Sequence, residues 1–252
     1  MASNRERFRP DPSLSRTEMK RLQREIAKAA TFEDALEVTP ADVRAGKAVV
    51  AGVDQAFLTD ADPALAVSAA VALRGEEVLE RVYAVTELEV PYVPGLLAFR
   101  EGGPILAALG EFTVEPDLYL FDGSGRIHFR QAGLATHVGV LRDRPSVGVA
   151  KSLLCGEPRQ SVEGLAAGER VPIVADADVT APDGTVLGYA YQSRQFDSGR
   201  INPLYVSPGH RMSAQTAVEF VAACGGDYKL PEPTRLADAY ADEAKAQVEG
   251  QS

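Results

Sequence analysis

The sequence predicts an α/β fold with a mixed sheet, in which three antiparallel strands are followed by parallel strands and helices flank the sheet. Three β-rich apolar segments first follow one another through short connections. Strand-like apolar segments then alternate with helical segments, which is typical of parallel βαβ units. The 252 residues are 45% hydrophobic, enough to form the core of one large domain.

The first element is a predicted basic amphipathic helix over 16–29. Ser15 and Glu18 have the spacing of a capping box, and apolar residues recur at helical intervals after them. The ten residues at the start of the chain are mostly polar, and we expect them to be frayed.

The next three elements are predicted strands over 47–57, 65–73 and 78–85, each rich in β-branched and apolar residues. A short turn with a glycine separates the second from the third, which is typical of a hairpin. Three strands with short connections in chain order predict an antiparallel meander.

The pattern changes at residues 91–95, PYVPG, which are predicted to form a rigid loop because each proline fixes φ. A helical segment over 96–112 follows, with an expected interruption at 102–104, Gly-Gly-Pro. The later predicted elements are strands over 118–121, 146–150, 171–174, 186–192 and 204–207, and helices over 130–141, over 213–223 and from about 234. This order of elements is that of the ribonuclease-H-like fold.

The domain organisation expected from these patterns has three parts. Residues 1–30 form a basic helical extension, 31–247 form a single ribonuclease-H-like domain, and 248–252 form a tail. No internal repeat and no linker-like stretch divides the central part.

The net charge of −10 argues against a nucleic-acid partner, since phosphate contacts need lysine and arginine. The charge is unevenly spread, however. Residues 1–30 carry eight basic and four acidic side chains, and residues 124–159 carry six and two. The composition therefore leaves a nucleic-acid partner open.

The cellular setting expected from the sequence is the cytoplasm, with no membrane partner. No apolar run approaches the ~18 residues needed to span a bilayer, and the first residues lack the apolar stretch of a signal peptide. Two cysteines, Cys155 and Cys224, cannot make a disulfide framework. We expect both thiols to be reduced.

Three carboxylates are the candidate metal ligands in this sequence. Asp54 and Asp122 each end an apolar strand, and Glu101 shares a helix face with Leu97 and Ile105. Each residue also has a purely structural interpretation. Asp54 could be a solvated aspartate past the strand end, and Asp122 could open the DGSG turn. The helix could end at Glu101 and leave its side chain exposed. In the predicted topology the three would converge, and three oxygen ligands suit Mg²⁺ or Mn²⁺.

Several long motifs resemble the endonuclease V family of deoxyinosine-specific repair nucleases. They run in the family's order across most of the chain: VVAGVDQAF (49–57), PYVPGLLAFREG (91–102), PDLYLFDGSG (116–125), GLATHVGV (133–140), PSVGVAKSLLCG (145–156), VSPGH (206–210) and LPEPTRLADAY (230–240). The resemblance implies a ribonuclease-H-like fold and Mg²⁺-dependent hydrolysis, with Mn²⁺ as a substitute. It also implies cleavage of the second phosphodiester 3′ to deoxyinosine, a deaminated adenine, leaving 3′-hydroxyl and 5′-phosphate ends.

The same resemblance assigns roles to the acidic residues and to one lysine. Asp54 and Asp122 would bind metal directly. Glu101 would bind metal directly or through water and help to position the attacking water. Asp238 would supply a fourth acidic group, and Lys151 would lie near the scissile phosphate. Without the motif, a solvated lysine at a strand end would be the preferred interpretation of Lys151.

Lesion recognition is assigned by resemblance to two loops. Tyr92, with Pro91 beside it, would insert where the lesion base leaves the stack; an aromatic wedge offsets part of the cost of unstacking. The residues expected to bind the flipped base or its surroundings are Gly95, Leu97, Gly133, Leu154 and His128.

The partner expected from the resemblance is DNA containing deoxyinosine, acted on by a monomer. Two alternatives remain: an inosine-specific ribonuclease acting on RNA, and a module that binds inosine or mismatches without cleavage. The 2′-hydroxyl contacts that separate RNA from DNA cannot be recognised in a sequence. The complete acidic set argues against the non-cleaving alternative.

Overall fold

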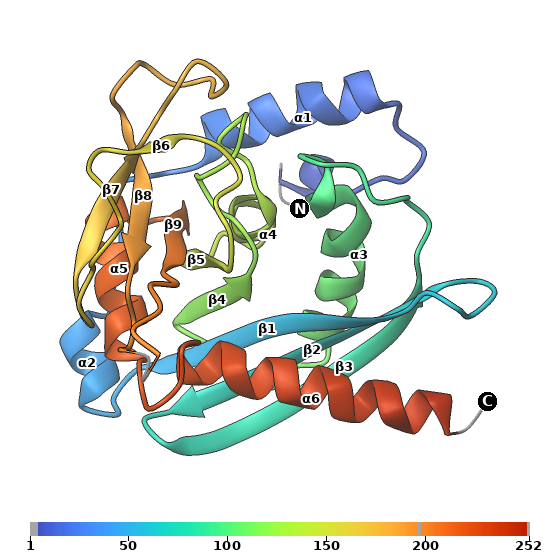
Figure 1. Ribbon diagram of the computed structural model, residues 1–252. Helices are drawn as coiled ribbons and strands as arrows, with labels where there is room; N and C mark the ends of the chain where they lie inside the picture. The colour runs from blue at the N-terminus through green and yellow to red at the C-terminus, as the bar shows by residue number, and fades with distance from the viewer. Residues whose placement is uncertain (1–4, 196–197, 251–252) are drawn as a thin grey trace.

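The computed structural model describes residues 5–195 and 198–250, and these form a nine-stranded sheet with helices on both faces (Figure 1). The strand order is β3-β2-β1-β4-β5-β9-β8-β7-β6. The strands are β1 (Val49–Leu58), β2 (Leu65–Arg74), β3 (Glu77–Glu87), β4 (Leu118–Asp122), β5 (Ser146–Ala150), β6 (Glu157–Pro158), β7 (Arg170–Val174), β8 (Val186–Tyr191) and β9 (Leu204–His210).

The sheet confirms the predicted mixed topology. β1, β2 and β3 are antiparallel, whereas β4 lies parallel to β1 and β5 lies parallel to β4. The predicted pairing of 186–192 with 204–207 is also confirmed, since β8 pairs with β9, which in turn runs antiparallel to β5. The parallel pairing of β1 with β4 matters for the site because it stops at Val53 and Phe121, where β4 ends. The expectation that Asp54 also ends its strand is wrong, since β1 continues to Leu58 through its pairing with β2.

Two helical layers cover the sheet (Figure 1). The helices are α1 (Arg16–Ala29), α2 (Pro40–Arg44), α3 (Leu97–Gly110), α4 (Leu134–Arg142), α5 (Ala214–Ala223) and α6 (Glu232–Glu249), with the 3₁₀ turn η1 (Glu6–Phe8). α3 and α4 pack through residues such as Ile105 and Val138 on one face of β1 and β4. α5 packs on the other face, where Val218 and Phe220 meet Leu118, and α6 crosses β1 on that side (Figure 1).

The expected interruption of the helix at 102–104 is wrong, because α3 runs without a break from Leu97 to Gly110 with Pro104 inside it. A proline at this place removes one helical hydrogen bond and usually kinks or ends a helix. Here Pro104 is buried, and the neighbouring Ile105 and Leu109 are both 1% exposed in the core. Tertiary packing therefore outweighs the local signal.

The predicted start of the helix at 130 is also wrong, since α4 begins at Leu134. Gln131 has a φ of +52°, which a helix does not allow. Its side chain accepts a hydrogen bond from Arg126 and donates one to the Thr180 carbonyl. These contacts hold the segment before α4 as a loop.

The N-terminal segment is not frayed from residue 5 onward; residues 1–4 lie outside the described residues. Phe8 is 2% exposed and packs with Ile26 of α1 and Val140 of α4. The predicted capping box of Ser15 and Glu18 is present at the start of α1. The buried ring of Phe8 therefore attaches the polar N-terminal segment to the rest of the fold.

The predicted tail at 248–252 lies partly outside the described residues, and its first part belongs to α6, which extends to Glu249. The short elements α2 and β6 were absent from the sequence prediction. Both cysteines are free and buried. Among the described residues, no helix is long and apolar enough to cross a bilayer.

Candidate active site

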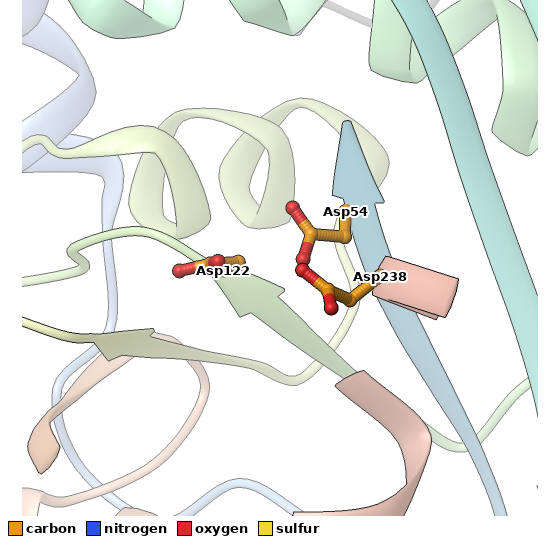
Figure 2. A group of neighbouring side chains, drawn as sticks. All are labelled: Asp54, Asp122 and Asp238. Carbon is orange, nitrogen blue, oxygen red and sulfur yellow. The ribbon is translucent and has the colours of Figure 1, made fainter. Parts of the chain in front are cut away.

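Three aspartates meet where β4 ends beside the middle of β1. Asp54, Asp122 and Asp238 each offer a carboxylate oxygen, and these oxygens lie within 4.8 Å of one another (Figure 2). The parallel register pairs Val53 with Phe121, so the aspartates that follow lie side by side. Asp238 comes from α6, more than a hundred residues later in the chain.

The position of α6 depends on one glycine. A Cβ atom on Gly52 would lie 1.9 Å from the carbonyl oxygen of Pro233 and 2.5 Å from the nitrogen of Thr234. The missing side chain lets the start of α6 lie directly on β1. This close contact brings Asp238, on the second turn of α6, over Asp54.

The electrostatics of this group favour a cation. Burial, followed by the negative charge of Asp122, raises the pKa of Asp54 to about 8, although the backbone N–H of Gln55 donates to its Oδ1 at 2.7 Å. The second oxygen, Oδ2, is buried and has no hydrogen-bond partner among the described residues. Three hard oxygen donors, one of them unsatisfied, fit a divalent ion such as Mg²⁺. The aspartate group could therefore hold a metal ion.

Lys151 follows β5 and lies against the same group. Its Nζ is 2.6 Å from Asp122 Oδ2 and 3.8 Å from Asp238 Oδ1. Burial opposes its charge, but the hydrogen bond and the charge of Asp122 raise its pKa, so it stays an ammonium. Half of its side chain is exposed, which leaves its charge accessible to an anion above the aspartates.

Glu101 lies beside the aspartates and outside the group of three. Because α3 continues past it, its side chain is half-buried rather than exposed at a helix end. Burial raises the pKa of Glu101 to about 7; Arg100 opposes the rise and Asp122 adds to it. Its backbone carbonyl also accepts a hydrogen bond from Gln55 at 3.5 Å. A carboxyl group with this pKa can exchange a proton near neutral pH.

A cavity of about 60 Å³ lies next to these residues. Its lining includes every predicted substrate-binding residue except Pro91: Tyr92, Gly95, Leu97, His128, Gly133 and Leu154. Ser124, two residues after Asp122, and Leu154, three after Lys151, connect the cavity with the acidic group. The structure thus brings the predicted recognition residues together around one hollow beside the aspartates.

The side chains around this cavity differ in accessibility. Tyr92 is 67% exposed at its rim, as a wedge requires, whereas His128 is 3% exposed in its wall. Burial lowers the pKa of His128 to about 3, with Arg130 contributing, so the imidazole is neutral. Both of its ring nitrogens already have partners, the Gly95 carbonyl and the Arg130 backbone N–H.

The sequence did not reveal Gln23, whose buried side chain contacts two residues that line the cavity, Gly95 and Ala132. The helical spacing could have indicated it, because Gln23 falls on the apolar face of α1, four residues after Met19 and three before Ile26. A polar residue on such a face has to find partners within the fold. Ser124, also in the lining, had no signal beyond the DGSG turn.

Fold and site together define a class of protein. A mixed sheet in this strand order carries carboxylates side by side on two neighbouring parallel strands, β1 and β4, with a lysine beside them. Such a group can hold a divalent ion against a phosphodiester. The molecule is a nuclease of the ribonuclease-H-like class.

The comparisons with known proteins identify the family. Residues 31–239 match the family model described as Endonuclease V. Endonuclease V of Natronomonas pharaonis is 66% identical over 241 residues, 95% of this chain and 96% of that protein. That of Haloarcula marismortui is 58% identical over 269 residues, 97% and 98%. The chain belongs to the endonuclease V family.

Solved structures agree with this assignment. Endonuclease V of Streptomyces avermitilis has a TM-score of 0.79 at 32% identity, covering 93% of this chain and 95% of that one. Endonuclease V of Ciona intestinalis has a TM-score of 0.75 at 26% identity, covering 92% and 98%. The Ciona protein is in complex with a 24mer DNA containing an inosine followed by a ribo-adenosine.

Proposed function

We propose that this protein is a Mg²⁺-dependent DNA repair endonuclease that recognises deoxyinosine. It hydrolyses the second phosphodiester 3′ to the lesion and leaves 3′-hydroxyl and 5′-phosphate ends. The observation that carries the proposal is the adjacency of two features: a divalent-ion group of three aspartates, and a cavity with Tyr92 exposed at its rim. The inosine-containing DNA bound by the Ciona relative supports the choice of lesion.

The acidic residues have different roles in the proposed reaction. Asp54, Asp122 and Asp238 would hold the metal, with Glu101 reaching it directly or through water. When bound, the ion supplies positive charge that favours attack on phosphorus and departure of the leaving oxygen. Glu101, half-buried beside the aspartates, orients the attacking water. Lys151 is accessible enough to stabilise charge on the phosphate.

Lesion recognition follows from the loop after β3. The rigid Pro91–Pro94 segment presents Tyr92, whose ring fills the place that the base leaves. The flipped base enters the cavity, where backbone groups of the lining contact its edge. Reading by backbone groups explains why the cavity lining carries few polar side chains.

The test of this function is a cleavage assay with Mg²⁺ on matched oligonucleotide duplexes with one deoxyinosine or one adenine. The expected product is a single nick at the second phosphodiester 3′ to inosine, with a ligatable 5′-phosphate. A protein that leaves the inosine strand intact contradicts the proposal, and a different nick position contradicts the cleavage rule. Size-exclusion chromatography of the same preparation tests the monomer expected from the sequence.

A second candidate substrate is inosine in RNA. The strand bound by the Ciona relative has a ribonucleotide directly after the inosine, so a 2′-hydroxyl at that place is compatible with the family's site. Parallel assays on RNA and DNA strands of the same sequence decide between the two, because the preferred strand will be cut faster at equal enzyme concentration.

Replacement of Tyr92 by alanine should reduce kcat/KM on an inosine duplex by about 10- to 100-fold, since unstacking costs a few kcal/mol. On a single strand, where the base is already unstacked, the loss should be less than about threefold. Tyr228→Ala is the matched control, because Tyr228 is 56% exposed and packs on Arg235 away from the cavity. Equal losses on both substrates would show that Tyr92 does not act as a wedge.

A further inference from the structure

We call the segment Pro91–Pro94, which carries Tyr92, the wedge loop. The backbone carbonyl of Gly95, the residue that follows it, accepts hydrogen bonds from three different side chains. Gln23 Nε2 donates at 3.0 Å, His128 Nε2 at 3.1 Å and Arg130 Nη2 at 2.8 Å. A carbonyl oxygen has two lone pairs, so three donors saturate it. A saturated, buried carbonyl is fixed in direction, and it fixes the peptide plane to which it belongs.

The direction of the Gln23 amide follows from its partners. Arg130 can only donate, and its Nε lies 2.6 Å from Gln23 Oε1. The amide nitrogen must therefore point the other way, toward the carbonyls of Gly95 and, at 3.4 Å, Ala132. His128 is ordered in the same way: its Nδ1 accepts from the Arg130 backbone N–H, so Nε2 carries the proton given to Gly95.

Gln23 connects two walls of the lesion cavity. Gly95 comes directly after the wedge loop, and Ala132 comes directly before Gly133 at the start of α4; both line the cavity. Gly95 has a φ of +74°, and a Cβ there would lie 3.0 Å from the Phe129 ring. The loop backbone is thus held in a conformation that needs glycine, with the Gln23 amide bridging it to the opposite wall.

The rest of α1 supports the same contact. Met19 and Leu22 pack with Val90 and Leu96, which flank the wedge loop. An apolar side chain at position 23 would pack in this cluster without the cost of burying an amide, yet Gln23 is 0% exposed. The Gln23 amide therefore contributes through its hydrogen bonds, which fix the positions of its partners, rather than through packing. The residues matched by the family model begin at 31, after the end of α1.

We propose that Gln23 is a positioning residue for lesion recognition: it holds the Gly95 carbonyl, and with it the wedge loop, at a fixed place relative to the Ala132 wall. The N-terminal helix is then part of the recognition apparatus rather than an appendage. This inference rests on the proposed function, because it assumes that the cavity receives the lesion base.

The decisive variant is Gln23→Glu in the full chain. A glutamate keeps the acceptor for Arg130 but has no donor for the carbonyls of Gly95 and Ala132, so folding should be retained while the bridge between the two walls is lost. We expect KM for the inosine duplex to rise about tenfold, the effect of one lost buried hydrogen bond. The kcat should change less than about threefold, since the aspartate group is untouched. Gln23→Ala should show the same pattern.

Two controls separate positioning from instability. A variant that merely unfolds in part lowers kcat through a smaller active fraction and leaves KM unchanged. Gln215→Ala removes two side-chain hydrogen bonds on and beside α5, one from Tyr189 and one to Glu219, and contacts neither Gly95 nor Ala132; its KM should equal that of the wild type. Mn²⁺ binding measured by calorimetry should be the same in all variants.

The outcomes distinguish the two proposals. If the wild type does not cut inosine strands, the proposed function fails. If the wild type cuts and Gln23→Glu has an unchanged KM, or loses only kcat, the positioning role of Gln23 is overturned. Should Gln23→Ala fail to fold, Gln23→Glu alone decides.

Discussion

Replacement of Asp54 by asparagine is expected to reduce Mg²⁺-dependent cleavage by on the order of 10³-fold and, without metal, to make the protein more stable. Asp54 is half-buried and faces Asp122 and Asp238, and one of its oxygens has no hydrogen-bond partner in the described part of the chain. Its pKa of about 8 shows that burial and like charge work against its ionised form. Asparagine has nearly the same shape and no charge, so it removes the repulsion together with the ligand.

Three measurements check this prediction. In EDTA at pH 8 the variant should melt about 2–8 °C above the wild type, the range for ~1–2 kcal/mol in a protein of this size. Mn²⁺ should raise the Tm of the wild type and leave that of the variant almost unchanged, because a ligand stabilises only a fold that binds it. Single-turnover cleavage measures the loss of activity.

Asp117→Asn is the matched control. Asp117 precedes β4, and its Oδ2 accepts a hydrogen bond from the Val49 backbone N–H at 2.8 Å, away from the acidic group. This variant should keep cleavage and the Mn²⁺ response while losing some stability. If Asp54→Asn still bound Mn²⁺ and cut at the wild-type rate, the metal assignment of the aspartates would be wrong.

The strands and two of the aspartates could be predicted from sequence because their signals are local. The segments around β1, β2 and β3 are β-rich runs with a short turn, and Asp54 and Asp122 each follow an apolar run. Parallel neighbours in register then place the two carboxylates side by side, although β1 continues past Asp54 to Leu58. The order of strands and helices along the chain is therefore enough to predict that Asp54 and Asp122 lie together.

Asp238 carries no such local signal. It lies on a helix with ordinary polar patterning, and only the family resemblance linked it to the site. Its place is set by contact between Gly52 and the start of α6, residues about 180 positions apart in the sequence. The continuity of α3 through Pro104 and the burial of Phe8 are likewise tertiary effects. Local propensities cannot report such contacts.

The acidic composition also has a different meaning once the structure is known. Three of the acidic side chains that argue against a nucleic-acid partner form the candidate metal group itself. Lys151, from the locally basic stretch over 124–159, lies against that group. The net charge of the chain therefore gives little information about what binds at this edge of the sheet.

The second large effect is expected from Gly52→Ala. The added Cβ would lie 1.9 Å from the Pro233 carbonyl oxygen and 2.5 Å from the Thr234 nitrogen. Both atoms belong to backbone, which cannot rotate away, so α6 must move off β1. Overpacking of this kind costs about 3 kcal/mol, and we expect Tm to fall by about 6–12 °C.

The same movement should damage the site, because Asp238 is carried by α6. Cleavage by Gly52→Ala should fall by about 10- to 100-fold, at least as far as in Asp238→Ala, and affinity for Mn²⁺ should fall with it. Gly110→Ala provides the control: this glycine ends α3, and a Cβ atom there would meet none of the described atoms within 4 Å, so its activity should be unchanged. A Gly52→Ala protein with wild-type Tm and metal affinity would show that α6 does not depend on this contact and that Asp238 is placed by other means.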